Sequence, residues 1–308
     1  MDKVIVIVGP TASGKSALAI EAAKRLNGEV ISADSMQVYK TMDIGTAKIT
    51  EEETDGVPHH LIDLMDPDGI WNVKTFQEAC RKAITDITAR HKVPILCGGT
   101  GLYLKAALYD YHFDEESDED SEPIRKELEA LSNKELWKLL EQKDPKALEK
   151  IHPNNRKRLL RAALMAQSDR PKSQREQAQN HEPVYDVYFV GLKDEDRSRE
   201  IERINKRVDM MFEAGLVEEV TKIFSDPKTW SWNSFQGIGY KEFKPYFQNE
   251  QTLGQVREQI KIHTRQYARR QMTWFNHQMP VHWYPVGKPE VVLKDLENWY
   301  GITDTQTS

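Results

Sequence analysis

The chain has 308 residues, of which 39% are hydrophobic and 30% are charged, and its formal net charge is −6. These proportions are typical of a soluble globular protein with one elaborated domain or two. No stretch approaches the roughly 18 consecutive apolar residues of a membrane-spanning helix, so we expect no membrane partner. Cys80 and Cys97 fall in apolar helix and strand patterns and fit buried thiols. Because the first strand also leaves no room for a signal peptide, we expect a cytoplasmic protein.

The first predicted element is an apolar strand that ends in a glycine-rich loop. Residues 4–8 predict a buried parallel strand, and residues 17–26 predict a helix that Asn27 and Gly28 terminate. Between them lie Gly9, Pro10, Thr11, Ala12, Ser13, Gly14, Lys15 and Ser16, in the order of a P-loop. The loop N–H groups and Lys15 attract phosphate oxygens, and Ser16 can ligate Mg²⁺. The alternative is a glycine-rich turn without a ligand, but the strand-loop-helix order favours a diphosphate site.

Further strands are predicted at residues 29–33, 93–97, 187–192 and 281–284, with helical patterns between them. This alternation predicts an α/β fold with a parallel sheet flanked by helices. The stretch from residue 114 to about 179 breaks the alternation, because it is charged and shows apolar residues at helical spacing. We therefore expect a catalytic core of residues 1–113 and 185–308, and a mainly helical insertion of residues 114–184.

Two of the predicted strands end in residues that could take part in chemistry. The second strand leads into Asp34, which lies at the same sheet edge as the P-loop if the strands are parallel. A carboxylate beside phosphates could serve Mg²⁺ or accept a proton, and the alternative is a helix cap. The third strand ends in Gly98, Gly99 and Thr100, without the acidic residue that many NTP-hydrolysing proteins use for Mg²⁺. This argues against a motor ATPase or a GTPase, but not against a small-molecule kinase.

Arg203 and Arg207 are four residues apart, so they lie on one face of a predicted helix. They flank an apolar stripe and could reach over the sheet edge to a phosphate. The alternative is that both are exposed and pair with Glu200 or Glu202.

Charge is unevenly distributed along the chain. Seven of the nine residues 114–122 are acidic, whereas residues 151–180 carry seven Lys or Arg against two acidic residues. In this basic segment Asn154 and Asn155 can cap a helix on which three basic residues share one flank. In residues 253–272 five basic residues stand against one acidic residue, and Tyr267 and Trp274 lie among or near them. Basic residues interleaved with aromatic ones suit RNA. Solvated helix faces and a buried aromatic stripe are the alternatives.

Together these segments resemble the bacterial tRNA dimethylallyltransferases. The motifs that carry the resemblance, in the order of that family, are GPTASGKS (9–16), ISADSMQVY (31–39), MDIGTAK (42–48), GGTGLY (98–103), HPNNRKRLLR (152–161) and QGIGYK (236–241). The resemblance extends from about residue 4 to about residue 285. The chain departs from the common pattern at Met36 and at Asn155, neither of which is a group that the chemistry requires.

The resemblance implies a P-loop, nucleotide-kinase-like fold and the transfer of a dimethylallyl group from dimethylallyl diphosphate to N6 of the adenosine on the 3′ side of the anticodon. It implies that Asp34 is the general base, that Thr100 lies beside it, that Arg207 and the P-loop hold the diphosphate, and that Mg²⁺ binds at Ser16. The anticodon stem-loop of tRNA would be the partner of a monomeric protein. Its implied contacts are Asp34, Ser35, Met36, Gln37, Thr100, Arg125, Lys157, Arg158, Leu159, Leu160, Arg161, Gln236, Gly237, Ile238, Gly239, Tyr240 and Lys241.

Three other functions compete with this hypothesis. One is prenylation of free AMP, ADP or ATP, which would need neither the basic insertion nor the basic and aromatic helix. A small-molecule or nucleotide kinase is the second, because a P-loop alone also fits ATP. The third is an RNA-binding P-loop protein without catalytic activity.

Overall fold

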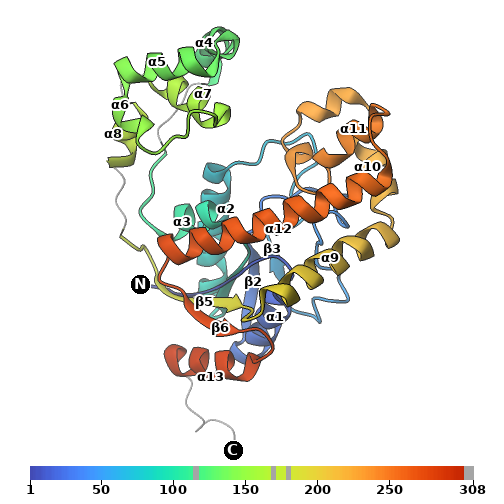
Figure 1. Ribbon diagram of the computed structural model, residues 1–308. Coiled ribbons are helices and arrows are strands. Elements are labelled where there is room, and N and C mark those ends of the chain that lie inside the picture. Colours follow the sequence, from blue (N-terminus) through green and yellow to red (C-terminus); the bar gives the residue numbers. More distant parts are fainter. Residues whose placement is uncertain (114–117, 168–170, 178–181, 302–308) are drawn as a thin grey trace, which may run out of the picture. The chain divides into compact units, whose positions relative to one another are not determined.

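The computed structural model describes residues 1–113, 118–167, 171–177 and 182–301 (Figure 1). The chain forms two compact units, one made of Met1–Tyr109 and Pro183–Ser308 and the other of Asp110–Glu182. Residues 114–117 of the acidic run and the polar tail after residue 301 lie outside what the structure describes. No helix of the described residues combines the length and the apolar character needed to span a membrane.

The first unit is built on a parallel sheet of six strands in the order β3-β2-β4-β1-β5-β6. The strands are β1 (Lys3–Val8), β2 (Gly28–Ser32), β3 (His59–His60), β4 (Val93–Cys97), β5 (Asp186–Lys193) and β6 (His282–Pro285). The predicted α/β fold with a parallel sheet is thus confirmed. The chain runs from β1 past β4 to β2 and later returns to β5. The carboxyl end of β1 is therefore the point where strand order reverses, and ligands bind at such points in open sheets.

Different helices cover the two faces of the sheet (Figure 1). Along β1, Val4, Val6 and Val8 belong to one apolar cluster while Ile5 and Ile7 belong to the other, as the period of two in a strand requires. The cluster of the valines includes residues of α2 (Val73–Ala89), α3 (Gly101–Leu108), α9 (Arg197–Glu213) and α12 (Leu253–Gln278). On the opposite face the isoleucines pack with α1 (Lys15–Leu26) and α13 (Pro289–Tyr300). β1 is buried from both sides, which explains its uninterrupted apolar sequence.

Helix α1 begins at Lys15, two residues before the predicted start, and ends where Asn27 adopts a left-handed conformation with φ 52°. The predicted stop at Asn27 is thus confirmed, but Gly28 is the first residue of β2. A Cβ at Gly28 would lie 2.7 Å from the carbonyl oxygen of Val93, so this glycine permits the close approach of β2 and β4.

Between α9 and α12 the chain forms α10 (Leu216–Phe224), the short 3₁₀ helices η1 (Pro227–Ser231), η2 (Ser234–Gln236) and η3 (Lys241–Phe243), and α11 (Lys244–Phe247). Aromatic residues hold these short pieces together. Phe224, Phe235, Tyr240 and Phe243 are all at most 2% exposed. This region is therefore a packed part of the first unit and gives its loops fixed positions.

The second unit is helical in its described residues. It contains α4 (Asp118–Ala130), α5 (Asn133–Lys143), α6 (Pro145–Leu148), α7 (Arg156–Met165) and α8 (Lys172–Gln177). Its own core includes Leu128, Leu136, Leu140 and Leu159. Ser132 and Glu135 form a capping box at the start of α5, which fixes the turn after α4.

Candidate active site

The P-loop connects the carboxyl end of β1 to the first turn of α1. Gly9 has φ 151°, and a Cβ there would lie 2.8 Å from the carbonyl oxygen of Leu192 in β5. Only glycine fits this close approach. Ala12 has φ 62°, which is unusual for a residue with a side chain. Its carbonyl oxygen accepts a hydrogen bond from Nε of Arg203 at 3.1 Å, so a side chain of α9 helps hold the loop in this conformation.

Lys15 points back over the loop, where its Nζ donates to the carbonyl oxygen of Pro10 at 2.7 Å. Burial lowers the pKa of Lys15 from 10.5 to about 8. The charge of Arg207 lowers this pKa further, whereas Asp34 acts in the opposite direction. These interactions bring the P-loop, the end of β2 and α9 to one site. A phosphate oxygen beside Lys15 would compensate for the lost hydration of its ammonium group.

Asp34 follows β2, and the structure shows the capping role that we weighed for it. Its Oδ1 accepts the backbone N–H groups of Met36 at 2.8 Å and Gln37 at 3.3 Å, so the carboxylate does cap the following turn. Among the described residues, Oδ2 accepts no hydrogen bond. The cap fixes the orientation of the carboxylate and leaves one oxygen for a ligand or a proton.

The loop after β4 packs directly on the loop after β2. A Cβ at Gly98 would lie 2.4 Å from the carbonyl oxygen of Ala33, so this contact requires glycine. The hydroxyl of Thr100 is buried and has no hydrogen-bond partner of normal geometry among the described residues, although the phenol of Tyr267 is its neighbour. Burial raises the pKa of Tyr267 to about 12, and the charge of Asp34 acts in the same direction. Thr100 therefore offers an unused polar group close to Asp34.

The two arginines of α9 have different roles. Arg207 is half-buried and pairs with no group of the described residues, and burial lowers its pKa while Asp34 raises it. Its charge is available to an anion. Arg203 binds the P-loop carbonyl, and its Nη1 lies 2.6 Å from Oδ2 of Asp194. The alternative in which both arginines are exposed and pair with Glu200 or Glu202 is wrong.

No group of three or more potential metal ligands of the His, Cys, Asp and Glu types occurs within the described part of the chain. A divalent cation at this edge would therefore take most of its ligands from substrate and water. Ser16, exposed in the first turn of α1, and the unpaired oxygen of Asp34 are hard oxygen donors, which fit Mg²⁺ bound together with phosphates.

A second group of loops is held together by Glu219 of α10. Its carboxylate accepts the backbone N–H groups of Asp43, Ile44 and Gly45 at 2.7–3.0 Å and the hydroxyl of Tyr240 at 2.7 Å. The segments 42–48 and 236–241 are thereby joined. Sequence patterns gave no signal for Glu219, because its partners lie far away in the chain.

Tyr240 is 0% exposed, so the structure offers no surface of this residue for its predicted contact with tRNA. Its ring packs so close to Gly45 that a Cβ there would lie 2.5 Å from it. Lys241 and Ile238 are half-buried, and Gln236 is exposed. Ser35, Met36 and Gln37 are also half-buried, and Gln37 donates to the carbonyl oxygens of Thr46 and Ala47 at 3.4 Å each. The loop after Asp34 is therefore connected to the segment 42–48.

Helix α7 of the second unit carries Lys157, Arg158 and Arg161 on its exposed side, where they pair with no group of the described residues. As expected, Asn155 caps the helix by accepting from the N–H of Arg158 at 3.2 Å. Leu159 is 0% exposed and belongs to the core of this unit, so the structure offers no surface of this residue for its predicted contact with tRNA. Leu160 is half-buried. Arg125 is exposed, and its Nε lies 4.0 Å from Oε1 of Glu129.

The sequence motifs did not single out Gln271 of α12, which is 6% exposed and lies between two of the loops described above. On the same helix Arg269 and Arg270 are exposed, whereas Tyr267 and Trp274 are partly buried. A Cβ at Gly101 would lie 2.2 Å from the ring of Trp274, so this tryptophan packs on the start of α3. Packing thus explains Trp274, and the exposed arginines remain candidates for RNA contact.

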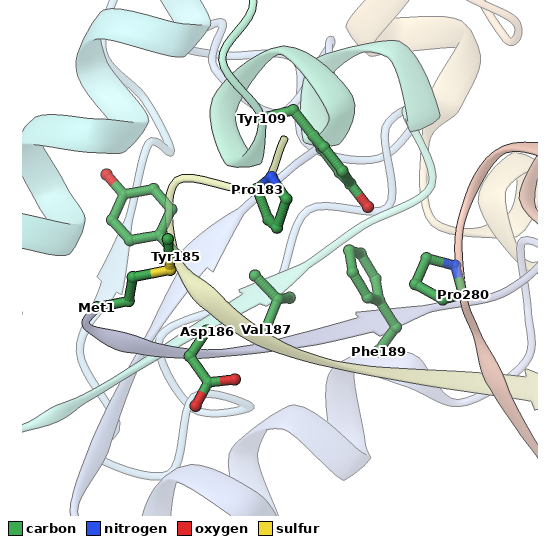
Figure 2. A pocket seen from close by; sticks show the side chains of 8 residues that line it. All are labelled: Met1, Tyr109, Pro183, Tyr185, Asp186, Val187, Phe189 and Pro280. Carbon is green, nitrogen blue, oxygen red and sulfur yellow. The ribbon is translucent and has the colours of Figure 1, made fainter. Parts of the chain in front are cut away.

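A hollow of about 500 Å³ lies elsewhere on the first unit. Figure 2 shows Tyr109, Pro183, Asp186 and Phe189 among its lining residues. Asp186 is the first residue of β5 and lies opposite Lys3, the first residue of β1, in the register of the sheet. The hollow therefore lies at the amino ends of these two strands. The P-loop follows their carboxyl ends. The hollow is therefore separate from the candidate active site.

Comparisons with known proteins show the family of the chain. A family model described as IPP transferase matches residues 37–278. The chain belongs to the IPP transferase family. The tRNA dimethylallyltransferase of Enterococcus faecalis is 46% identical over 310 residues, with 96% of each chain covered. That of Anoxybacillus flavithermus is 46% identical and covers 92% of this chain and 90% of its own.

Solved structures of related proteins have the same fold. The structure of the tRNA delta(2)-isopentenylpyrophosphate transferase of Staphylococcus epidermidis matches with a TM-score of 0.72 at 42% identity. The match covers 98% of the present chain and 99% of the S. epidermidis chain. A eukaryotic dimethylallyltransferase acting on tRNA gives a TM-score of 0.84 at 29% identity, over 100% of this chain and 82% of its own. The predicted resemblance is thus confirmed over nearly the full length.

Proposed function

We propose that this protein transfers a dimethylallyl group from dimethylallyl diphosphate to N6 of the adenosine on the 3′ side of the anticodon in tRNA. The observation that carries the proposal is the meeting of Lys15, Arg207 and Asp34 at one sheet edge, where Arg207 and Asp34 both act on the pKa of Lys15 and Asp34 acts on that of Arg207. Two cations beside a P-loop suit a departing diphosphate, and a carboxylate beside them suits proton removal. Membership of the IPP transferase family supports this combination.

In the proposed reaction the bond between C1 of the dimethylallyl group and the diphosphate oxygen breaks, and the diphosphate leaves with the electron pair. The allylic cation that develops is spread over three carbons, which makes this ionisation accessible. N6 of adenine attacks C1 and loses a proton to Oδ2 of Asp34. Adenine N6 is a weak nucleophile because its lone pair is delocalised into the ring, so most of the catalysis consists of stabilising the leaving group.

The P-loop amides, Lys15 and Arg207 would bind the diphosphate and balance the charge that grows on it. Mg²⁺, held by Ser16 together with the diphosphate oxygens, would supply further positive charge. The buried hydroxyl of Thr100, which lacks a partner among the described residues, is suited to hydrogen-bond the base near its N6 group.

The acceptor is proposed to be tRNA because of the exposed basic residues. Lys157, Arg158 and Arg161 on α7, and Arg269 and Arg270 on α12, are unneutralised within the described residues. Drawing the adenosine out of the anticodon stack costs a few kcal/mol, which contacts to the phosphate backbone can offset. A free adenine nucleotide would need none of these residues.

The test is an assay with purified protein, Mg²⁺, dimethylallyl diphosphate and unmodified tRNA, with nucleosides quantified by mass spectrometry. Asp34→Asn keeps an oxygen that can cap the turn but removes the base, so it should abolish product while thermal stability and tRNA binding persist. The exposed Asp68 is the site of the matched control Asp68→Asn, which should be fully active. Normal turnover in Asp34→Asn would refute the role of the base.

A further inference from the structure

Gln271 of α12 makes one hydrogen bond to each of two loops that are far apart in the sequence. Its Oε1 accepts from the backbone N–H of Thr11 in the P-loop at 3.2 Å. Its Nε2 donates to the carbonyl oxygen of Gly99, beside Thr100, at 3.0 Å. The side chain is buried, so water does not compete for either bond. Gln271 is therefore a direct link between the two loops.

The fit around this amide is tight and chemically specific. A Cβ at Gly99 would lie 1.9 Å from Nε2 of Gln271, so the glycine makes room for the amide. An amide supplies a donor and an acceptor at once. A glutamate could accept from Thr11 but would face the Gly99 carbonyl with a second oxygen, and a methionine would make neither hydrogen bond.

The two linked loops carry the two halves of the proposed reaction. The P-loop would hold the leaving diphosphate, whereas Thr100 lies beside Asp34 on the acceptor side. During transfer, C1 of the donor would move from the diphosphate at the P-loop toward the adenine beside Asp34 and Thr100. The separation of the loops therefore sets the distance between the breaking and the forming bond, and misplacement by about 1 Å can cost about 100-fold in rate.

We infer that Gln271 is a positioning residue that holds the P-loop and the Thr100 loop at the separation needed for prenyl transfer. This inference rests on the proposed function. When Gln271 is replaced, Arg203 still holds the P-loop at the carbonyl oxygen of Ala12, and Lys15 and Arg207 are unchanged, so we expect the affinity for the donor to change little. The rate of the chemical step, in contrast, depends on the link.

The experiment compares Gln271→Met and Gln271→Glu with wild type under single-turnover conditions at saturating dimethylallyl diphosphate and tRNA. Gln259→Met is the matched control. Gln259 lies on the same helix, twelve residues away, and its side chain makes no hydrogen bond to the described residues. We expect the transfer rate of both Gln271 variants to fall at least tenfold. The dissociation constant of inorganic pyrophosphate, measured by calorimetry with Mg²⁺, should change less than threefold, and Gln259→Met should match wild type.

Two outcomes would overturn the inference: a wild-type transfer rate in Gln271→Met, or weakened pyrophosphate binding together with a transfer rate that returns to the wild-type value when the donor concentration is raised. Absence of transfer by the wild-type protein would instead refute the proposed function, so the two failures are distinguishable.

A second perturbation tests the link from its other end, and it applies even if the Gln271 variants do not fold. Gly99→Ala introduces a Cβ where Nε2 of Gln271 lies, which displaces the flexible amide. We expect the same loss of transfer rate with unchanged pyrophosphate affinity, and no further loss when Gly99→Ala is combined with Gln271→Met. Full activity of Gly99→Ala, or losses that multiply in the double variant, would contradict the inference.

Discussion

The lowered pKa of Lys15 predicts that donor binding becomes weaker as the pH rises through about 8. The cause is burial, which disfavours the ammonium form in the free protein. A diphosphate binds the ammonium form, and its negative charge raises the pKa of Lys15 in the complex. Below pH 8 the free protein already carries the proton, so affinity is constant there. Above pH 8 binding must take up a proton, and affinity falls.

The size of the effect follows from the pKa. With a pKa of about 8, the protonated fraction of Lys15 falls from about 0.9 at pH 7 to about 0.1 at pH 9, a tenfold loss of affinity or about 1.4 kcal/mol. Neighbouring groups titrate higher, since burial raises the pKa of Cys97 to about 11 and that of Tyr267 to about 12. The terminal phosphate of the donor loses its last proton near pH 6, well below this range.

The assay is isothermal titration calorimetry of dimethylallyl diphosphate without tRNA, from pH 7 to pH 9.5. Buffers with different ionisation enthalpies report proton uptake, which should reach about three quarters of a proton at pH 8.5 for a pKa of about 8. Lys15→Arg, whose guanidinium stays charged, should bind with an affinity that does not change over this range. Constant affinity of the wild-type protein, or the same decline in Lys15→Arg, would refute the reasoning.

Three further predictions concern the supports of the site. Arg203→Lys cannot reach both the P-loop carbonyl and Asp194, so pyrophosphate affinity should fall about tenfold by calorimetry, consistent with one charge-assisted hydrogen bond; unchanged affinity would contradict this. Glu219→Gln should raise the KM for tRNA severalfold in steady-state assays and leave the Kd of the donor unchanged, because its partners lie in segments 42–48 and 236–241. Lys157→Ala and Arg161→Ala should each reduce the salt dependence of tRNA binding by about one unit of slope, and an unaltered slope would exclude phosphate contacts there.

The sheet could be predicted because most of its strands contain short apolar runs, and β1, β2 and β4 are buried almost throughout. Five of the six strands follow from such runs, with bounds within one or two residues. The exception is β3, which consists of His59 and His60 alone and pairs with Val30 and Ile31. Two polar residues carry no strand pattern. His60 is held at this edge by a 2.6 Å bond to Glu29, which no sequence spacing indicates.

The residues of the site at the ends of β1, β2 and β4 could be predicted, because the carboxyl ends of parallel strands meet at one edge. The contacts that hold these loops in place could not. Arg203, Glu219 and Gln271 contact partners more than 170 positions away in the chain, and spacing rules apply only within one element. Motifs also do not separate surface contacts from packing, which is why Leu159 and Tyr240 were assigned to tRNA although both are buried.

The most direct test of the proposed activity offers the protein a choice of acceptor. The purified protein, Mg²⁺ and dimethylallyl diphosphate are incubated with unmodified tRNA in one reaction and with AMP in another, and the products are quantified by mass spectrometry. The proposed function predicts N6-dimethylallyladenosine in the tRNA digest and no prenylated AMP. Prenylated AMP with unmodified tRNA, or turnover of ATP without any prenyl donor, would contradict it.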